Sequence, residues 1–256
     1  MSEVKRPGRV GLLVTCLVDQ FRPEAGFAAV RLLEEAGYAV EVPLQGCCGQ
    51  PNFNAGDNAG ARAMARRVID IFEDFDYIVV PSGSCAAMLR MHYPGLFVPG
   101  SADHSRAASL AGRTWELTAF LHDVAGFTAI DAHFDGAVVL HDSCSALREL
   151  NVREQPRALL AQVRGCRVQA LAGSDVCCGF GGLFCVKYPD ISNRMAEKKI
   201  ADLLTTGEAA DTLVSTDLGC LLHLAGKLHR DGVAIDVRHI AELLAGTTDP
   251  AAGRKE

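Results

Sequence analysis

The chain lacks two features that define large functional classes. No apolar run reaches the roughly 18 residues of a membrane-spanning helix. The 25 Lys and Arg are outnumbered by 31 Asp and Glu, which gives a net charge of −6. The basic residues are scattered along the chain, whereas a nucleic-acid surface needs them clustered. We therefore expect neither a transmembrane segment nor a nucleic-acid partner.

Common catalytic and nucleotide-binding motifs are missing as well. The glycine-rich stretch GFGG (179–182) matches neither GxGxxG nor GxxxxGK[ST], so it does not indicate a phosphate-binding loop. No Ser-His-Asp or Cys-His arrangement is indicated by the order of residues. We therefore assign no catalytic residue from the sequence.

Cysteine, in contrast, is abundant. Ten cysteines are too sparse to form a disulfide scaffold in 256 residues. A chain of this length, 49% hydrophobic, can build its core without covalent cross-links. Patterned cysteines in a cytosolic protein indicate metal or redox chemistry instead.

The cysteine pattern occurs twice along the chain. Cys16 precedes the pair Cys47-Cys48 by 31 residues, and Cys85 follows Cys48 by 37. In the second half the same order repeats with spacings of 33 and 42, for Cys144, Cys177, Cys178 and Cys220. A repeat of this length predicts a duplicated domain, with one cysteine-rich unit over residues 1–130 and a second over 131–256.

Each half also has alternating strand and helix patterns, which predict an α/β fold of two βαβαβ modules with parallel sheets. Short apolar runs predict strands over 9–16, 38–48, 76–85, 135–144, 166–178 and 211–220. Apolar residues at helical spacing predict helices over 23–37, 58–75, 114–126, 192–207 and 236–246.

The predicted topology brings distant cysteines together. Every predicted strand ends near a cysteine, and the carboxyl ends of parallel strands share one edge, where α/β proteins bind ligands. Grouped thiolates repel one another unless a cation gathers them, and soft sulfur ligands suit zinc or iron–sulfur clusters. We therefore predict metal ligands at Cys16, Cys47, Cys48, Cys85, Cys144, Cys177, Cys178 and Cys220. A single cysteine such as Cys166 is instead typical of core packing.

Several motifs give the chain a resemblance to a known family. It resembles the lactate-utilisation protein A family, whose CCG cysteine-rich domains also occur in heterodisulfide reductase and in the glycolate oxidase iron–sulfur subunit. The resemblance covers nearly the whole chain and rests on TCLVDQFRPE, CCGQPNFNAG, VVPSGSCAAMLRMHYP, HDSCSALREL, CCGFGGLFCVKYPDIS and STDLGCLLH.

The resemblance implies a soluble cytoplasmic protein without its own flavin. It would relay electrons as L-lactate becomes pyruvate, as one subunit of an oxidoreductase complex. A [4Fe–4S] cluster, cubane or non-cubane, would occupy at least one module, with zinc as an option in the other. The implied partners are a ferredoxin-domain iron–sulfur protein and a third small subunit.

The chain also departs from the pattern of its reductase relatives, in which a final CxxC supplies a fifth cysteine. Here the equivalent positions are Met88 and His223. His223 is a candidate replacement ligand and Cys185 a spare one, although packing explains either. The pair His141-Asp142 indicates a brace for the cysteine loop or a proton relay.

Two other functions stay open. Four thiolates per module are also what structural zinc requires, which is consistent with a zinc-organised scaffold that binds partners and moves no electrons. The reductase relatives suggest direct cleavage of a disulfide, although the missing fifth cysteine argues against it.

Overall fold

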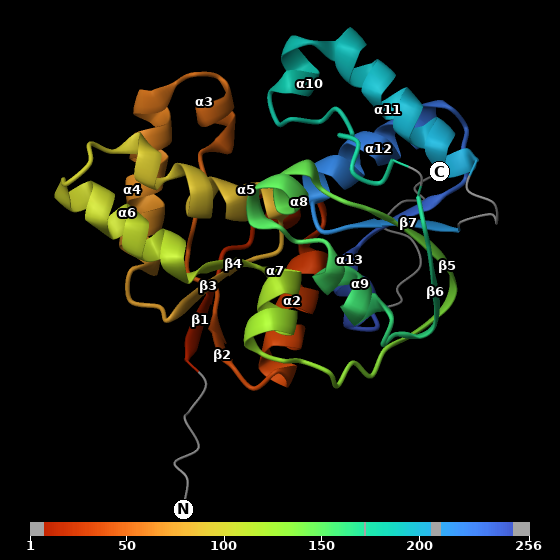
Figure 1. The fold of residues 1–256 in the computed structure, drawn as a ribbon, viewed down its shortest axis with the longest axis horizontal. Coiled ribbons are helices and arrows are strands. Elements are labelled where there is room, and N and C mark those ends of the chain that lie inside the picture. The colour runs from red at the N-terminus through yellow and green to blue at the C-terminus, as the bar shows by residue number, and fades with distance from the viewer. Residues whose placement is uncertain (1–7, 172, 206–210, 248–256) are drawn as a thin grey trace, which may run out of the picture.

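The computed structural model describes residues 8–171, 173–205 and 211–247. They form two four-stranded parallel sheets with helices between the strands, so the predicted α/β class is confirmed (Figure 1). The first sheet has the order β2-β1-β3-β4 and the second β6-β5-β7-β8, the same order within each half. The strands are Arg9–Leu12 (β1), Ala39–Glu41 (β2), Tyr77–Val80 (β3), Thr114–Glu116 (β4), His133–His141 (β5), Arg164–Gln169 (β6), Thr212–Ser215 (β7) and Asp236–His239 (β8).

The helices cover both sheets and supply the segments between strands. They are Cys16–Phe21 (α1), Pro23–Glu35 (α2), Gln50–Asn54 (α3), Asn58–Phe72 (α4), Gly83–Ala87 (α5), Met88–His92 (η1), Pro94–Leu96 (η2), Ala102–Arg113 (α6), Leu117–Ala119 (α7), Phe120–Val124 (η3), Cys144–Leu150 (α8), Glu154–Leu160 (α9), Phe184–Lys187 (α10), Pro189–Leu204 (α11), Leu218–Arg230 (α12) and Ile240–Leu244 (α13). Within the described ranges, none of them has the length and apolar character of a membrane span.

Local sequence explains where the long helices begin and end. Asp57 caps α4 by accepting a hydrogen bond from the Gly60 amide, and α2 begins at a proline, which suits a first helical turn. Gly37, which follows α2, has φ +90°, a conformation that glycine adopts without strain. The helix predicted over 192–207 begins earlier, at Pro189, and its last two residues lie outside the described residues.

Two predictions about the ends of the modules were wrong. The stretches 114–126 and 236–246 were expected to be helical, but each begins with a fourth strand. β4 pairs with β3 through Thr114 opposite Ile78, and β8 pairs with β7 through Val237 opposite Leu213. These strands are three and four residues long, too short for an alternating pattern to emerge, and a helix follows each at once.

All six predicted strands end earlier than expected, and two of them end well before their cysteines. β2 ends at Glu41 rather than near Cys47, and β6 ends at Gln169 rather than near Cys178. Pro43 has no amide hydrogen to donate to a sheet, and Gly173 has φ +65°, so neither segment continues as a strand. The cysteine pairs consequently lie in loops that follow the strands.

The two halves share one hydrophobic core. Val10 and Leu12 of β1 belong to the same buried cluster as Val138 and Leu140 of β5. Helices α2 and α13, one from each half, pack side by side near the centre of Figure 1. The division of the chain near residue 130 stays a prediction, since a shared core binds the two sheets into one body.

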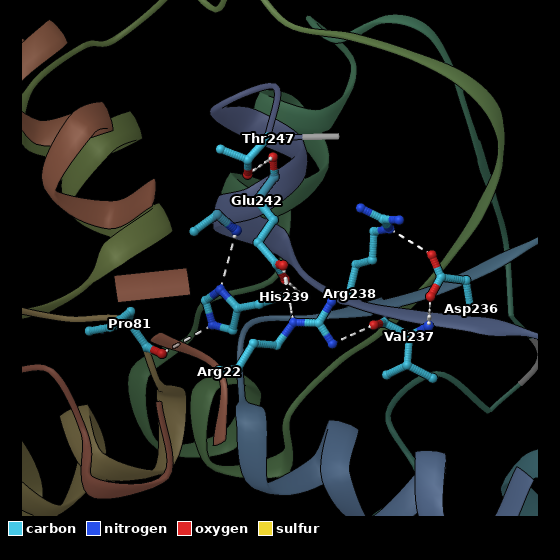
Figure 2. A network of polar contacts seen from close by, with 9 residues as sticks. Arg22, Pro81, Asp236, Val237, Arg238, His239, Glu242 and Thr247 are labelled. Carbon is cyan, nitrogen blue, oxygen red and sulfur yellow. Dashed lines mark hydrogen bonds and ion pairs between the residues drawn. The ribbon is translucent and has the colours of Figure 1, made fainter. Parts of the chain in front are cut away.

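Polar contacts reinforce this junction, as Figure 2 shows. The Arg22 guanidinium, between α1 and α2, forms an ion pair of 2.9 Å with Glu242 of α13 and donates to the Val237 carbonyl at 2.8 Å. The side chains of Arg22 and Glu242 are 17% and 7% exposed. A second contact joins the halves, since the ring of His239 in the second half lies 3.1 Å from the Pro81 carbonyl in the first.

We predict that Arg22→Met destabilises the protein by about 3 kcal/mol, because it leaves a buried carboxylate unpaired. Burial raises the pKa of Glu242 and Arg22 opposes that rise. Without Arg22 the folded state binds this proton more tightly than the unfolded state does, so the stability of the variant falls as pH rises above about 4.5. Urea unfolding between pH 4.5 and 8 measures the free energy of unfolding of the variant and of the wild type. The difference between these two free energies should become smaller toward pH 4.5.

Arg31→Met is the matched control, because Arg31 pairs with Glu35 on the exposed face of α2. We expect it to cost about 0.5 kcal/mol or less, with no comparable dependence on pH. Equal losses in the two variants would contradict the assigned role of Arg22.

Candidate metal centres

The predicted cysteines lie where strands give way to helices or loops. Cys16 and Cys144 are the first residues of α1 and α8, each just beyond the end of β1 or β5. Cys85 lies in α5 after β3, and Cys220 in α12 after β7. Because the strands are parallel, these positions share the carboxyl edge of each sheet. The pairs Cys47-Cys48 and Cys177-Cys178 approach the same edges from their loops.

In the first half the structure brings four sulfurs together, and we call Cys16, Cys47, Cys48 and Cys85 the first quartet. The Sγ atoms of Cys16 and Cys47 are 3.9 Å apart, and those of Cys48 and Cys85 are 3.2 Å apart. The Gly49 amide donates to the Cys47 sulfur at 3.4 Å. Cys48 and Cys85 are buried, while the other two are half-buried.

The second half repeats this arrangement with Cys144, Cys177, Cys178 and Cys220, the second quartet. The sulfurs of Cys178 and Cys220 lie within 4.8 Å of each other, and hydrogen bonding between neighbouring thiols lowers the pKa of Cys177 and raises those of Cys144 and Cys178. The Gly179 and Phe180 amides donate to the sulfurs of Cys177 and Cys178, at 3.4 and 3.5 Å. All eight predicted cysteines thus lie within their expected groups, and their role as ligands stays a prediction.

The electrostatics of both quartets favour a bound cation. Hydrogen bonds from Cys16 and then Cys48 lower the pKa of Cys47 well below the usual range of a thiol. Hydrogen bonding to Cys47, followed by burial, raises the pKa of Cys16 far above that range. The same division occurs between Cys177 and Cys144. One sulfur per quartet therefore ionises readily, and full ionisation needs a positive centre to offset the repulsion.

The backbone beside each pair also fits an inorganic centre. Gly49 and Gly179 have φ of +82° and +93°, which L side chains rarely adopt. A Cβ on Gly179 would lie 2.6 Å from the Ser192 carbonyl oxygen, and one on Gly49 would lie 2.9 Å from the Met64 Cβ. These glycines let the loop turn so that amides face the sulfurs, an arrangement that tunes metal–sulfur centres. Both donor sets therefore fit a soft metal or an iron–sulfur cluster.

Both quartets open onto the space between the halves. The first lines a cavity of about 290 Å³ and the second a cavity of about 130 Å³. Five residues line both cavities, so the two lie next to each other: Gln50, Ser84, Phe180, Gly182 and Asp217. Phe180 and Leu183 belong to the second cysteine loop yet line the cavity of the first quartet. Each site is therefore completed by the opposite half.

Asp217 joins the helices that carry Cys85 and Cys220. Its Oδ1 caps α12 by accepting from the Gly219 and Cys220 amides, at 3.1 and 3.4 Å. Its Oδ2 accepts from the Ser82 hydroxyl at 3.0 Å and from the Ser84 amide at 2.8 Å. Ser82 is the cap of α5, so one carboxylate, 2% exposed, holds the starts of both helices.

The three additional ligand candidates, His223, Cys185 and Met88, each have contacts outside the quartets. His223 Nε2 lies 3.1 Å from the Ser192 hydroxyl, which itself donates to the Gly179 carbonyl, so His223 braces the second cysteine loop. The Cys185 thiol donates to the Gly182 carbonyl at 3.3 Å. Met88 is fully buried in the core cluster that contains Cys48 and Cys85. These contacts give each of the three side chains a structural role, and none of them tests ligation.

The neighbouring residues His141 and Asp142 have different surroundings. The Asp142 carboxylate accepts two 2.8 Å hydrogen bonds from Arg157 of α9, and its role as a brace stays a prediction. His141 is 1% exposed, and one of its nitrogens lies within 4.8 Å of the sulfurs of Cys178 and Cys220. Burial, and then the charge of Lys199, lower its pKa to about 4.

Sequence patterns alone did not mark His141 as a candidate ligand, and Asp217 was missed altogether. A signal existed for both, since each lies three residues before a cysteine of the second quartet. At the matching positions of the first half, before Cys16 and Cys85, stand Leu13 and Ser82. Aligning the two halves would have marked these differences.

Comparison with known proteins agrees with this duplicated arrangement. A family model described as "Cysteine-rich domain" (CCG) matches residues 10–90 and again 138–225. Proteins named lactate utilization protein A from Bacillus cytotoxicus and Bacillus cereus are each 43% identical over 237 residues, covering 92% of this chain and 98% of theirs.

Among solved structures, a glutamate racemase from Bacillus anthracis aligns over 94% of this chain and 79% of its own, with 10% identity and a TM-score of 0.35. That likeness is too weak to carry any argument.

We predict that Asp217→Asn weakens both quartets together. An amide nitrogen in place of one oxygen leaves two of the four donors without an acceptor, at a cost of about 1–3 kcal/mol. Melting temperature and metal content per chain measure the effect, and both should fall. Asp57→Asn is the control, because it changes an exposed cap to an equally good one. Unchanged metal content in Asp217→Asn would refute the shared role.

Proposed function

Because this chain belongs to the family of lactate utilization proteins A, with two matches to the cysteine-rich CCG domain, we propose that it transfers electrons in a complex that oxidises L-lactate to pyruvate. In this proposal it is the iron–sulfur subunit. The observation that carries it is the gathering of eight cysteines into two quartets beside one another. The relatives' name supports lactate as the substrate of the pathway.

An iron–sulfur cluster supplies the one-electron chemistry that amino-acid side chains lack. The chain's own part is to hold that group and shield it. Cys144, Cys177, Cys178 and Cys220 would bind one [4Fe–4S] cluster, cubane or non-cubane. Cys16, Cys47, Cys48 and Cys85 would bind a second centre, either a cluster or zinc. The amides of Gly49, Gly179 and Phe180 donate to sulfur at both sites, which favours the electron-rich thiolate form.

The position of the quartets also supports a relay. Both cavities lie at the junction of the halves and share five lining residues, so electrons entering at one quartet have a short route to the other. We extend the proposal to companion subunits, a ferredoxin-domain iron–sulfur protein and a third small subunit, which would deliver and remove the electrons. We also propose that the complex works in the cytoplasm.

A zinc-organised scaffold is the second candidate function. Four thiols per quartet equal the number of ligands in a structural zinc site, which is the observation in its favour. Such a protein would bind partners without changing oxidation state. A third candidate, cleavage of a disulfide, is favoured by the cavity of about 290 Å³ beside the first quartet. Assay of the purified chain alone with a heterodisulfide distinguishes it from a relay.

We predict that the protein purified without oxygen contains iron and acid-labile sulfide, and that its visible absorption bleaches with dithionite. Cys178→Ser and Cys220→Ser should each remove the iron of the second quartet, because serine is a poor ligand for a soft metal. Iron, sulfide and zinc analysis per chain measures this. Cys166→Ser is the control, since Cys166 lies on β6, outside both quartets.

Different results would select the other candidates. Zinc without iron, and no absorption that bleaches, would establish the scaffold. A folded protein that binds no metal would refute both metal-based functions. Mixing the chain with its companion subunits then tests the substrate, since L-lactate should bleach the absorption faster than glycolate does.

A further inference from the structure

We propose that His141 is a nitrogen ligand of the metal centre at the second quartet. That centre would be bound by an imidazole together with thiolates, whereas the first quartet binds its centre through sulfur alone. The inference rests on the proposed function for the presence of a metal, and it adds a ligand that the cysteine pattern does not contain.

The position of His141 carries the inference. It is the last residue of β5, and its ring is 1% exposed. One of its nitrogens and the sulfurs of Cys178 and Cys220 all lie within 4.8 Å of one another. Three ligand atoms of zinc- or iron-binding type, from a strand, a loop and a helix, thus converge on one point.

The lack of hydrogen bonds to the ring of His141 also supports a role as a metal ligand. Among the described residues, neither Nδ1 nor Nε2 has a hydrogen-bond partner. A buried polar group without a partner costs about 1–3 kcal/mol, so such groups are rare unless something absent from the protein chain satisfies them. Coordination of a metal satisfies one nitrogen, and neutral imidazole is the commonest metal ligand in proteins.

The neighbours of His141 hold its backbone without using its ring. Its carbonyl accepts from the Ser215 hydroxyl at 2.9 Å, which ties the end of β5 to β7. The carboxylate of the next residue, Asp142, accepts two hydrogen bonds from Arg157. Neither of these contacts uses a ring nitrogen of His141.

The two halves differ at this position. Leu13 stands three residues before Cys16, as His141 stands three before Cys144. Leu13 is fully buried in the same apolar cluster as Cys48 and Cys85. Leucine has no lone pair and cannot bind a metal. The second quartet therefore has a possible nitrogen ligand, His141, at a position where the first quartet has none.

His223, the other imidazole near the second quartet, is committed elsewhere. Its Nε2 contacts the Ser192 hydroxyl at 3.1 Å, and it is not part of the converging group. Imidazole is neutral, whereas a thiolate at the same position would add a negative charge and lower the reduction potential of an iron–sulfur centre. The centre at the second quartet should therefore accept electrons more readily with His141 than with a thiolate in its place.

Pulsed electron paramagnetic resonance on the reduced protein tests the inference, with histidine labelled by ¹⁵N. We expect a strongly coupled nitrogen in the wild type and in His223→Gln. The coupling should be lost in His141→Leu, which installs the residue of the first half, and in His141→Cys. His141→Cys should retain the metal through its new thiolate, and its second centre should shift to a lower potential. Rescue of metal binding by a thiol separates ligation from mere packing.

The outcomes distinguish this inference from the proposed function. Iron and sulfide without a coupled histidine nitrogen in the wild type would overturn the inference and leave the electron-transfer proposal intact. Loss of the coupling in His223→Gln rather than His141→Leu would overturn it too. If the quartets hold zinc, X-ray absorption at the zinc edge should show a nitrogen neighbour that disappears in His141→Leu, and a spectrum of sulfur alone would refute the ligand. A protein without any metal would refute both.

Discussion

The mutual repulsion of ionised sulfurs is the constraint on which this structure depends. Each quartet holds four sulfurs close together and partly or wholly out of water, with Cys48 and Cys85 only 3.2 Å apart. Hydrogen bonds from neighbouring thiols lower the pKa of Cys47 and Cys177, while the pKa values of their partners Cys16 and Cys144 are raised. The arrangement is therefore suited to a positive centre, and the amides of Gly49, Gly179 and Phe180 donate to the sulfurs that would bind it.

Two similar sheets pack across a common core, and this packing places the two quartets beside each other. Neither quartet is enclosed by its own half, because the loop around Phe180 lines the cavity of the first, while Gln50 and Ser84 line the cavity of the second. Asp217 adds a physical link, since its two oxygens hold the starts of α5 and α12. The ion pair between Arg22 and Glu242 is a further contact between the halves.

Duplication set the plan of the molecule, and divergence gave the halves different chemistry. The strand order is the same in both sheets, yet Leu13 and Ser82 of the first half correspond to His141 and Asp217 of the second. Both changes add a nitrogen or a charge next to a cysteine. In the proposed relay, two centres with different surroundings would differ in reduction potential, and that difference would give electron flow a direction.

Much of this organisation follows from the sequence alone. Cysteine spacing and short apolar runs are local features, and they were enough to predict the parallel α/β class and the repeat of the cysteine pattern. The strands β4 and β8 were not predicted because three or four residues are too few to show an alternating hydrophobic pattern. Their extended conformation depends on pairing with β3 and β7, which are distant in the sequence. The convergence of His141 on Cys178 and Cys220, the bridge through Asp217 and the shared cavities were decided only by the tertiary structure. They depend on how one sheet lies against another, a relation that no spacing along the chain records.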